Sequence, residues 1–296
     1  MKWLLILALL FSLKAEAKEI KMIVAYSAGG PIDLITRTVA KHLSSDKYKF
    51  IPEYRIGAGG AIALNHLAAI KDDTAIMVMS NALVSMPVMS SVNYNIERDF
   101  ALIDFLGYEP LLLVVNSKNQ IKTYKQFQQY SKTNNMPYGS GGVGTSGHIT
   151  AAIVAQDNKN FFHVPYKGSS GIVIDLLNDN IKWMIDSETN VGSFIQEGKV
   201  QPLAVYSNKR LKQYPQTPTL KELGVDDREF YRWFIVIANK NADPEIVKYV
   251  ASKLEARELK EDLVKHNLVL DKPNLKTFFL DETVKIRRIV RDIDLK

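Results

Sequence analysis

Three glycines near the middle of the chain have the spacing of a nucleotide-binding motif. Gly139, Gly141 and Gly144 form G-x-G-x-x-G within YGSGGVGTSGHITAA, residues 138–152. A dinucleotide site needs a buried strand before the glycines, a helix after them, and an acid about twenty positions further on. Only the helix requirement is met, by HITAAIVAQ, because the lead-in is polar and Asp157 follows too closely. We therefore interpret the loop as a general anion site at a helix N-terminus.

A second glycine loop precedes the first expected helix. Residues 27–30, SAGG, follow the apolar strand EIKMIVAYS. Pro31 suits the first helical position, with Gly30 as N-cap and Asp33 in the first turn. If both loops face one cleft, two helix N-termini direct N–H groups and hydroxyls at a carboxylate. The alternative is that each loop is only a tight turn, at which glycine is common.

Other catalytic and metal-binding patterns are weak. The nearest approach to the nucleophile elbow G-x-S-x-G is GTSGH at residues 144–148, where the last glycine comes one residue early. No acid can be identified that would orient His148, and no pair of the five histidines has metal-ligand spacing. The chain has no cysteine, which excludes disulfides and thiolate metal sites. We expect no metal and no cofactor, and a secreted α/β hydrolase remains the alternative function.

The N-terminus has the form of a secretory signal peptide. Lys2 precedes an apolar run from Trp3 to Leu13, and the residues AEA at 15–17 fit an A-x-A cleavage site. The run is too short for a membrane span of ~20 residues. We predict that residues 1–17 are removed on export. The net charge of +6 is dispersed, with no dense basic run and interleaved aromatics that would indicate nucleic-acid binding.

The mature chain alternates strands and helices, which is typical of parallel α/β sheets. Two apolar strands, near residues 111–116 and 230–238, flank a middle block with its own α/β pattern. This arrangement predicts an α/β fold of two lobes joined by two crossovers, which together form a hinged clamp. Domain 1 is expected at 18–112 and 229–296, and domain 2 at 113–228. A ligand would bind between the lobes, at loops that leave the strand C-termini.

Six stretches of the mature chain together resemble the receptors of tripartite tricarboxylate transporters, also called Bug-type receptors. They are, in order, IVAYSAGGPIDLITRTVAKHL, EYRIGAGGAIALNHLA, NIERDFALIDFLGYEPLLLVVNS, YGSGGVGTSGHITAA, HVPYKGSSGIVIDLLNDNIKWMID and GKVQPLAVYSNKRLKQYPQTPTLKELGV. The resemblance implies a type II periplasmic-binding fold and a monomeric, non-enzymatic periplasmic receptor. It also implies that the receptor delivers a small carboxylate to the membrane subunits of a tripartite permease. A receptor that feeds a sensor kinase is an alternative that the sequence leaves open.

The expected ligand-binding residues come mainly from the two glycine loops that the resemblance assigns to carboxylate binding. Asp186 is added because it ends the strand IKWMID, where its side chain can orient a hydroxyl, an amine or a water. We expect the Thr145 hydroxyl and the amide of Gly144 to donate to the ligand. The full set is Tyr26, Ser27, Ala28, Gly29, Gly30, Asp33, Asn81, Ser140, Gly141, Val143, Gly144, Thr145, His148, Tyr166 and Asp186.

Overall fold

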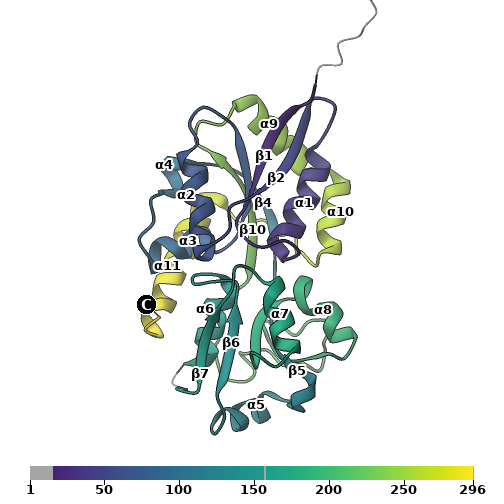
Figure 1. Ribbon diagram of the computed structural model, residues 1–296, viewed down its shortest axis with the longest axis vertical. Coiled ribbons are helices and arrows are strands. Elements are labelled where there is room, and N and C mark those ends of the chain that lie inside the picture. The colour runs from purple at the N-terminus through teal and green to yellow at the C-terminus, as the bar shows by residue number, and fades with distance from the viewer. Residues whose placement is uncertain (1–15, 157, 296) are drawn as a thin grey trace, which may run out of the picture.

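The protein has two lobes stacked along its long axis, as the computed structural model shows (Figure 1). The structure describes residues 16–156 and 158–295. The predicted signal peptide, residues 1–17, therefore falls outside the described residues except for Glu16 and Ala17. The two lobes each contain one mixed five-stranded sheet with helices packed around it. This two-lobed α/β architecture confirms the predicted fold class.

The first lobe contains a sheet with the strand order β2-β1-β3-β10-β4. Its strands are β1 (Lys18–Val24), β2 (Tyr48–Tyr54), β3 (Ala75–Met79), β4 (Phe100–Glu109) and β10 (Arg232–Asn239). Strands β1, β2 and β3 are parallel, whereas β10 runs antiparallel to both β3 and β4. Its helices are α1 (Pro31–Leu43), α2 (Ala61–Ala69), α3 (Ala82–Met89), α4 (Ile96–Asp99), α9 (Pro244–Leu254), α10 (Arg257–Lys265) and α11 (Leu275–Asp292).

The second lobe repeats the plan with the strand order β7-β6-β8-β5-β9. Its strands are β5 (Leu111–Asn116), β6 (Met136–Ser140), β7 (Phe161–Pro165), β8 (Trp183–Ser187) and β9 (Val200–Tyr206). Its helices are α5 (Tyr124–Ser131), α6 (Ser146–Ala155), α7 (Ser170–Leu177) and α8 (Glu188–Gln196). Strands β6, β7 and β8 are parallel, and β5 is antiparallel to β8 and β9.

Two crossovers join the lobes. The first runs from β4 to β5 through Pro110, and the second enters β10 through Phe230 and Tyr231. Strand β4 supplies one side of the hinge, and the sequence pattern did not single it out. Its burial follows no clean alternation along FALIDFLGYE, because part of the strand lies under α9 and part against the returning chain at Val269.

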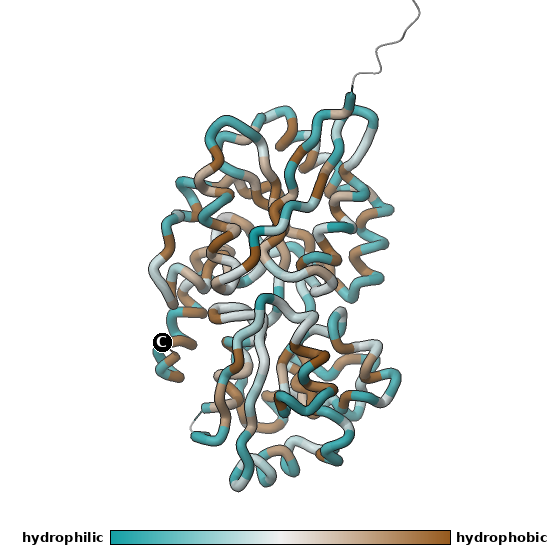
Figure 2. The backbone as a smooth tube through the Cα atoms, viewed as in Figure 1, coloured by the Kyte–Doolittle hydropathy of each residue, from teal (hydrophilic) through white to brown (hydrophobic). Residues whose placement is uncertain are grey.

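Each lobe has an apolar interior, which Figure 2 shows as brown segments of the backbone tube toward the middle of the lobe. In the second lobe, the buried Trp183 packs edge-on against Phe127 and Phe161 and lies 4.7 Å, centroid to centroid, from Tyr138. In the first lobe, Trp233 is buried at the base of the hinge strand. Both tryptophans therefore serve packing in the interior of their lobes.

Candidate ligand-binding site

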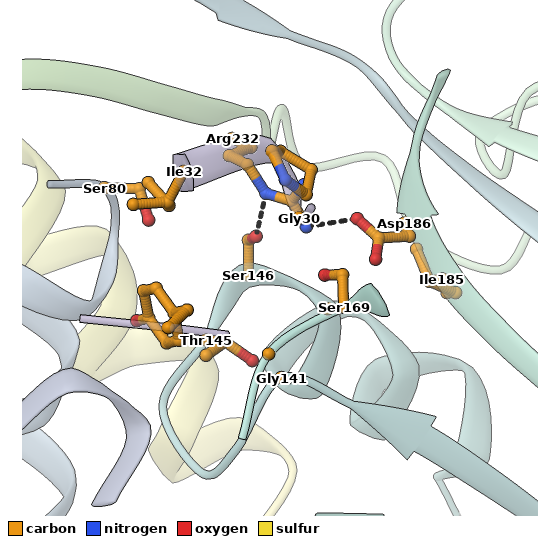
Figure 3. A pocket seen from close by; sticks show the side chains of 14 residues that line it. Gly30, Ile32, Ser80, Gly141, Thr145, Ser146, Ser169, Ile185, Asp186 and Arg232 are labelled. Carbon is orange, nitrogen blue, oxygen red and sulfur yellow. Dashed lines mark hydrogen bonds and ion pairs between the residues drawn. The ribbon is translucent and has the colours of Figure 1, made fainter. Parts of the chain in front are cut away.

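A cavity lies between the two lobes, at the ends of strands from both sheets (Figure 3). Its volume is about 30 Å³, which is room for roughly two water molecules. Its lining residues are Tyr26, Gly30, Pro31, Ile32, Ser80, Gly141, Thr145, Ser146, Gly147, Gly168, Ser169, Ile185, Asp186 and Arg232.

The first lobe approaches the cavity with the starts of two helices. Gly30 is the N-cap of α1 and Pro31 its first residue, as predicted, so the amide of Ile32 lies in the first turn. Ser80 follows β3 and stands directly before Asn81, the N-cap of α3. First-turn N–H groups have no acceptor within their own helix, and the helix dipole adds partial positive charge. This side of the cavity therefore favours an anion.

The second lobe contributes two more helix starts. The loop at residues 141–145 precedes α6 and is called the α6 loop below. Its last residue, Thr145, caps α6, because the Thr145 hydroxyl oxygen accepts from the amide of His148. Ser146 and Gly147 then line the cavity. The second helix start is the loop from Gly168 to Ser169 before α7, which the sequence reasoning did not include. Its signal was present in KGSSG, which repeats the glycine–serine composition of the other loops. Four helix N-termini thus surround one cavity.

Arg232 is the cationic side chain of the site and was missed by the sequence reasoning. Its Nε donates to Ser146 Oγ at 3.1 Å, and its Nη2 donates to Asp186 Oδ1 (Figure 3). Its Nη1 donates to Ser187 Oγ at 2.9 Å and to Glu109 Oε1 at 3.3 Å. Burial acts to lower the pKa of Arg232, but the charges of Asp186 and Glu109 outweigh it and raise the pKa. The signal in the sequence was one arginine in the apolar run YRWFIVIAN.

Glu109 lies behind Arg232 at the end of β4 and is fully buried. Burial raises the pKa of its carboxyl group to about 7, although Arg232 acts in the opposite direction. The Thr189 hydroxyl lies 2.6 Å from both Glu109 Oε2 and the carbonyl oxygen of His266. A hydroxyl has one proton and a carbonyl has none to give. The proton of the Thr189 hydroxyl is therefore shared by the two oxygens, and the hydroxyl links Glu109 at the end of β4 to the chain at His266.

Of the predicted site residues, Tyr26, Gly30, Gly141, Thr145 and Asp186 line the cavity. The hydroxyl of Tyr26 donates to the carbonyl of Gly59 at 2.9 Å, and burial raises its pKa above its usual range. The Thr145 hydroxyl donates to the carbonyl of Gly142 at 2.8 Å. The proton that we expected at the ligand is therefore used inside the loop, where it holds the helix cap.

Several other predicted residues have their polar groups engaged away from the cavity. The carboxylate of Asp33 accepts from the amide of Gly29 and pairs with Arg37 on α1. The amide side chain of Asn81 donates to the carbonyl of Tyr231 at 3.0 Å and accepts from the amide of Trp233 at 3.3 Å. Asn81 therefore ties α3 to the hinge strand.

Two predicted residues of the second lobe, Ser140 and His148, both contact His163. Ser140 Oγ lies 2.6 Å from His163 Nε2, and the rings of His148 and His163 are 4.2 Å apart. His148 Nδ1 accepts from the amide of Gly144 at 3.3 Å, so this amide, which we expected to donate to the ligand, is used inside the loop. Burial, with a smaller effect of His163, lowers the pKa of His148 to about 3, and burial lowers that of His163 to about 4. The two neutral histidines pack behind the α6 loop and stabilise it.

The remaining predicted residues do not line the cavity. Ala28 and Gly29 are exposed on the loop at residues 27–30, and Val143 is exposed on the loop at residues 141–145. Tyr166 donates its hydroxyl to Asp175 and packs beside Gly139 and Gly171.

The lobes touch directly across the cleft. The amide of Ser27 donates to the carbonyl of Lys167 at 2.9 Å, and Ser27 Oγ lies 3.0 Å from Ser170 Oγ. On the other side, the Ser85 hydroxyl donates to the carbonyl of Gly144. Ser27 therefore joins the two lobes instead of facing the cavity. In the described residues, no group of three or more His, Cys, Asp and Glu side chains is placed to hold a metal ion.

Two α/β lobes that enclose a cavity at their strand-to-helix loops define a solute-binding protein of the periplasmic receptor class. No helix of the described ranges is both long and apolar enough to pass through a membrane. The chain belongs to the family described as the tripartite tricarboxylate transporter family receptor, which residues 35–295 match. This membership confirms the predicted family.

Individual relatives extend the comparison along nearly the whole chain. Protein BugT of Bordetella pertussis is 25% identical over 295 residues, which cover 95% of this chain and 90% of BugT. The solved periplasmic binding protein BugD superposes with a TM-score of 0.86 at 22% identity, covering 94% of this chain and 98% of BugD. The R. palustris protein Rpa4515 with adipate gives 0.85 at 21% identity, covering 94% and 97%. These likenesses show a shared fold.

Proposed function

We propose that the protein captures a small carboxylate between its lobes and delivers it to a tripartite membrane permease. The observation that carries the proposal is the convergence of four helix N-termini, those of α1, α3, α6 and α7, on one cavity. A carboxylate that leaves water must regain about four acceptor contacts, and first-turn N–H groups supply them without mobile charge. The structure solved with adipate supports the same ligand chemistry.

The site favours binding over catalysis. Ser146 accepts a hydrogen bond from Arg232, and the neighbouring histidine, His148, is held by the amide of Gly144 and the His163 ring. A base with a pKa of about 3 is a poor proton acceptor for a serine nucleophile. We therefore favour a receptor over the hydrolase alternative. Product analysis by NMR after incubation with carboxylate esters tests this choice, and ester turnover would contradict it.

Calorimetry on the mature protein tests the ligand class. Acetate, succinate, adipate and citrate form the panel, and adipamide is the matched control for adipate because it keeps the chain but lacks the charge. At least one carboxylate should bind saturably. If adipate is that ligand, adipamide should bind at least tenfold more weakly, since a hydrogen bond to a charged group contributes ~1.5–3 kcal/mol. Equal binding of the diamide, or tight binding of NADH with no carboxylate bound, would refute the proposal.

Delivery and export follow from the same proposal. We expect removal of residues 1–17, so the intact mass of the periplasmic protein should correspond to a chain that begins at Lys18. We also expect this protein to be a monomer in solution. Deleting the gene should abolish uptake of the bound carboxylate at low concentration. If uptake persists while a transcriptional response to the ligand is lost, the receptor serves a sensor kinase instead of a permease.

A further inference from the structure

Arg232 does not use all of its hydrogen-bonding capacity within the protein. A guanidinium has five N–H donors. One goes to Ser146 Oγ, two on Nη1 go to Glu109 and Ser187, and one on Nη2 goes to Asp186 Oδ1. The second N–H of Nη2 has no acceptor among residues 16–156 and 158–295. Since Arg232 is buried and lines the cavity, this donor is available to a molecule bound there.

Asp186 has spare capacity of the opposite kind beside it. A carboxylate offers about four lone-pair sites. Oδ1 accepts from the amide of Ser187 at 2.8 Å and from Arg232, and Oδ2 accepts from Asn190 Nδ2 at 3.0 Å. One acceptor position on Oδ2 is left over. Asp186 is 2% exposed and lines the cavity, so a donor and an acceptor stand side by side on one buried wall.

We propose that Arg232 and Asp186 make the receptor selective for carboxylates that also carry a hydroxyl group. The hydroxyl oxygen accepts from Arg232 Nη2, and the hydroxyl proton is donated to Asp186 Oδ2. This inference rests on the proposed capture of a carboxylate by the helix N-termini and adds a second recognition point. The two residues act on specificity, while the helix starts hold the carboxylate itself.

Other ligand groups match this wall less well. An ammonium group can donate to Asp186 but leaves the Arg232 donor without an acceptor, and a second carboxylate can accept from Arg232 but leaves the Asp186 acceptor without a donor. A methylene leaves both the donor and the acceptor without a partner in a site that excludes most water. A site built to hydrogen-bond a ligand hydroxyl discriminates strongly against the analogue that lacks it, because its buried polar groups are then unpaired.

Matched ligands test the inference on the unmodified protein. The probes are L-malate against succinate and L-lactate against propionate, with L-alanine as the ammonium analogue of lactate, all measured by calorimetry. In each pair that binds, the ligand with the hydroxyl group should bind about tenfold to a hundredfold more tightly than the ligand without it. Equal affinities within each pair would overturn the inference and leave the carboxylate proposal standing. If no carboxylate binds at all, the proposed function fails, and the inference fails with it.

A substitution at Asp186 gives an independent readout. In Asp186→Asn the amide oxygen is retained where Ser187 and Arg232 both donate, so the NH₂ group takes the place of Oδ2 and the Asn190 side chain must turn its amide oxygen toward it. The wall then presents two donors, and a keto oxygen becomes the better match. The affinity ratio of lactate to pyruvate should fall at least tenfold relative to the parent. Asp175→Asn, which removes a carboxylate of the same lobe that does not line the cavity, is the control and should keep the parent ratio.

Circular dichroism of both variants is the control for folding. An unchanged lactate-to-pyruvate ratio in folded Asp186→Asn would refute the assignment of the hydroxyl to this wall. If Asp186→Asn does not fold, the ligand pairs on the parent protein decide the question alone.

Discussion

Gly59 lies where the first lobe touches the α6 loop of the second lobe, and an alanine there should act as a wedge between the lobes. Its φ is +60°, and a Cβ atom at this position would lie 2.0 Å from the carbonyl oxygen of Val143. Ordinary van der Waals contact begins at 3.4 Å, so the lobes must move apart at this point. We predict that Gly59→Ala folds but does not reach the closed arrangement.

The expected loss follows from the contacts around the wedge. Three of the hydrogen bonds that cross the cleft join its loops: two involve Ser27, and the third joins Ser85 to Gly144. At a net ~1 kcal/mol each, their loss disfavours closure by about 3 kcal/mol. If ligand binds tightly only between closed lobes, Gly59→Ala should weaken binding about a hundredfold. The radius of gyration at saturating ligand should remain larger than that of the parent protein.

A matched control separates the wedge from backbone strain. Gly198 has a φ of +68°, and a Cβ there would meet nothing within 4 Å. Alanine in a left-handed conformation costs roughly 1–2 kcal/mol at either position, so both variants should lose similar stability. Calorimetry with the tightest-binding carboxylate, together with X-ray scattering, compares them. If Gly59→Ala binds as tightly as Gly198→Ala, the contact with Val143 is absent from the bound state and the reasoning is wrong.

Three further predictions concern the cap, the hinge and the lobes. Thr145→Val should lower the free energy of unfolding by about 1 kcal/mol through loss of the α6 cap, whereas Thr145→Ser should retain it. Denaturant unfolding measures the loss, and a stability unchanged by the valine would contradict the capping role. For Glu109, burial first, opposed by Arg232, raises the pKa from 4.5 to about 7. Glu109 therefore makes its full contribution to the free energy of unfolding below pH 4.5, and this contribution is lost as pH rises through about 7. The unfolding free energy of the parent, measured relative to Glu109→Gln, should fall by at most ~3 kcal/mol between about pH 5 and about pH 8; a flat difference would rule this out. Saturating carboxylate should lower the radius of gyration of the parent protein, because both lobes contact the ligand, and an identical scattering profile would argue against closure.

Local chemistry explains why parts of the site could be predicted from the sequence. Gly30 followed by Pro31 encodes the start of α1, and Thr145 encodes the start of α6, because helix caps are decided by a few neighbouring residues. Apolar runs likewise predicted most strands of both sheets. The segment after Asp243 forms two helices, α9 and α10, which are separated by Glu255 and Ala256. Both pieces have the same amphipathic period, so the pattern alone does not show the break.

The sequence by itself thus determined the alternation of strands and helices, the two-lobed plan, and the loops at which helices begin. The tertiary structure decided which groups face the cavity. It brought Arg232 to Ser146 and Asp186, which lie 86 and 46 positions away along the chain. It also directed the Thr145 hydroxyl into its own loop and placed Gly168 against Ser27 of the other lobe. Caps and periodicity depend on residues a few positions apart, whereas the polar wall of the cleft depends on the packing of both lobes, which no local pattern records.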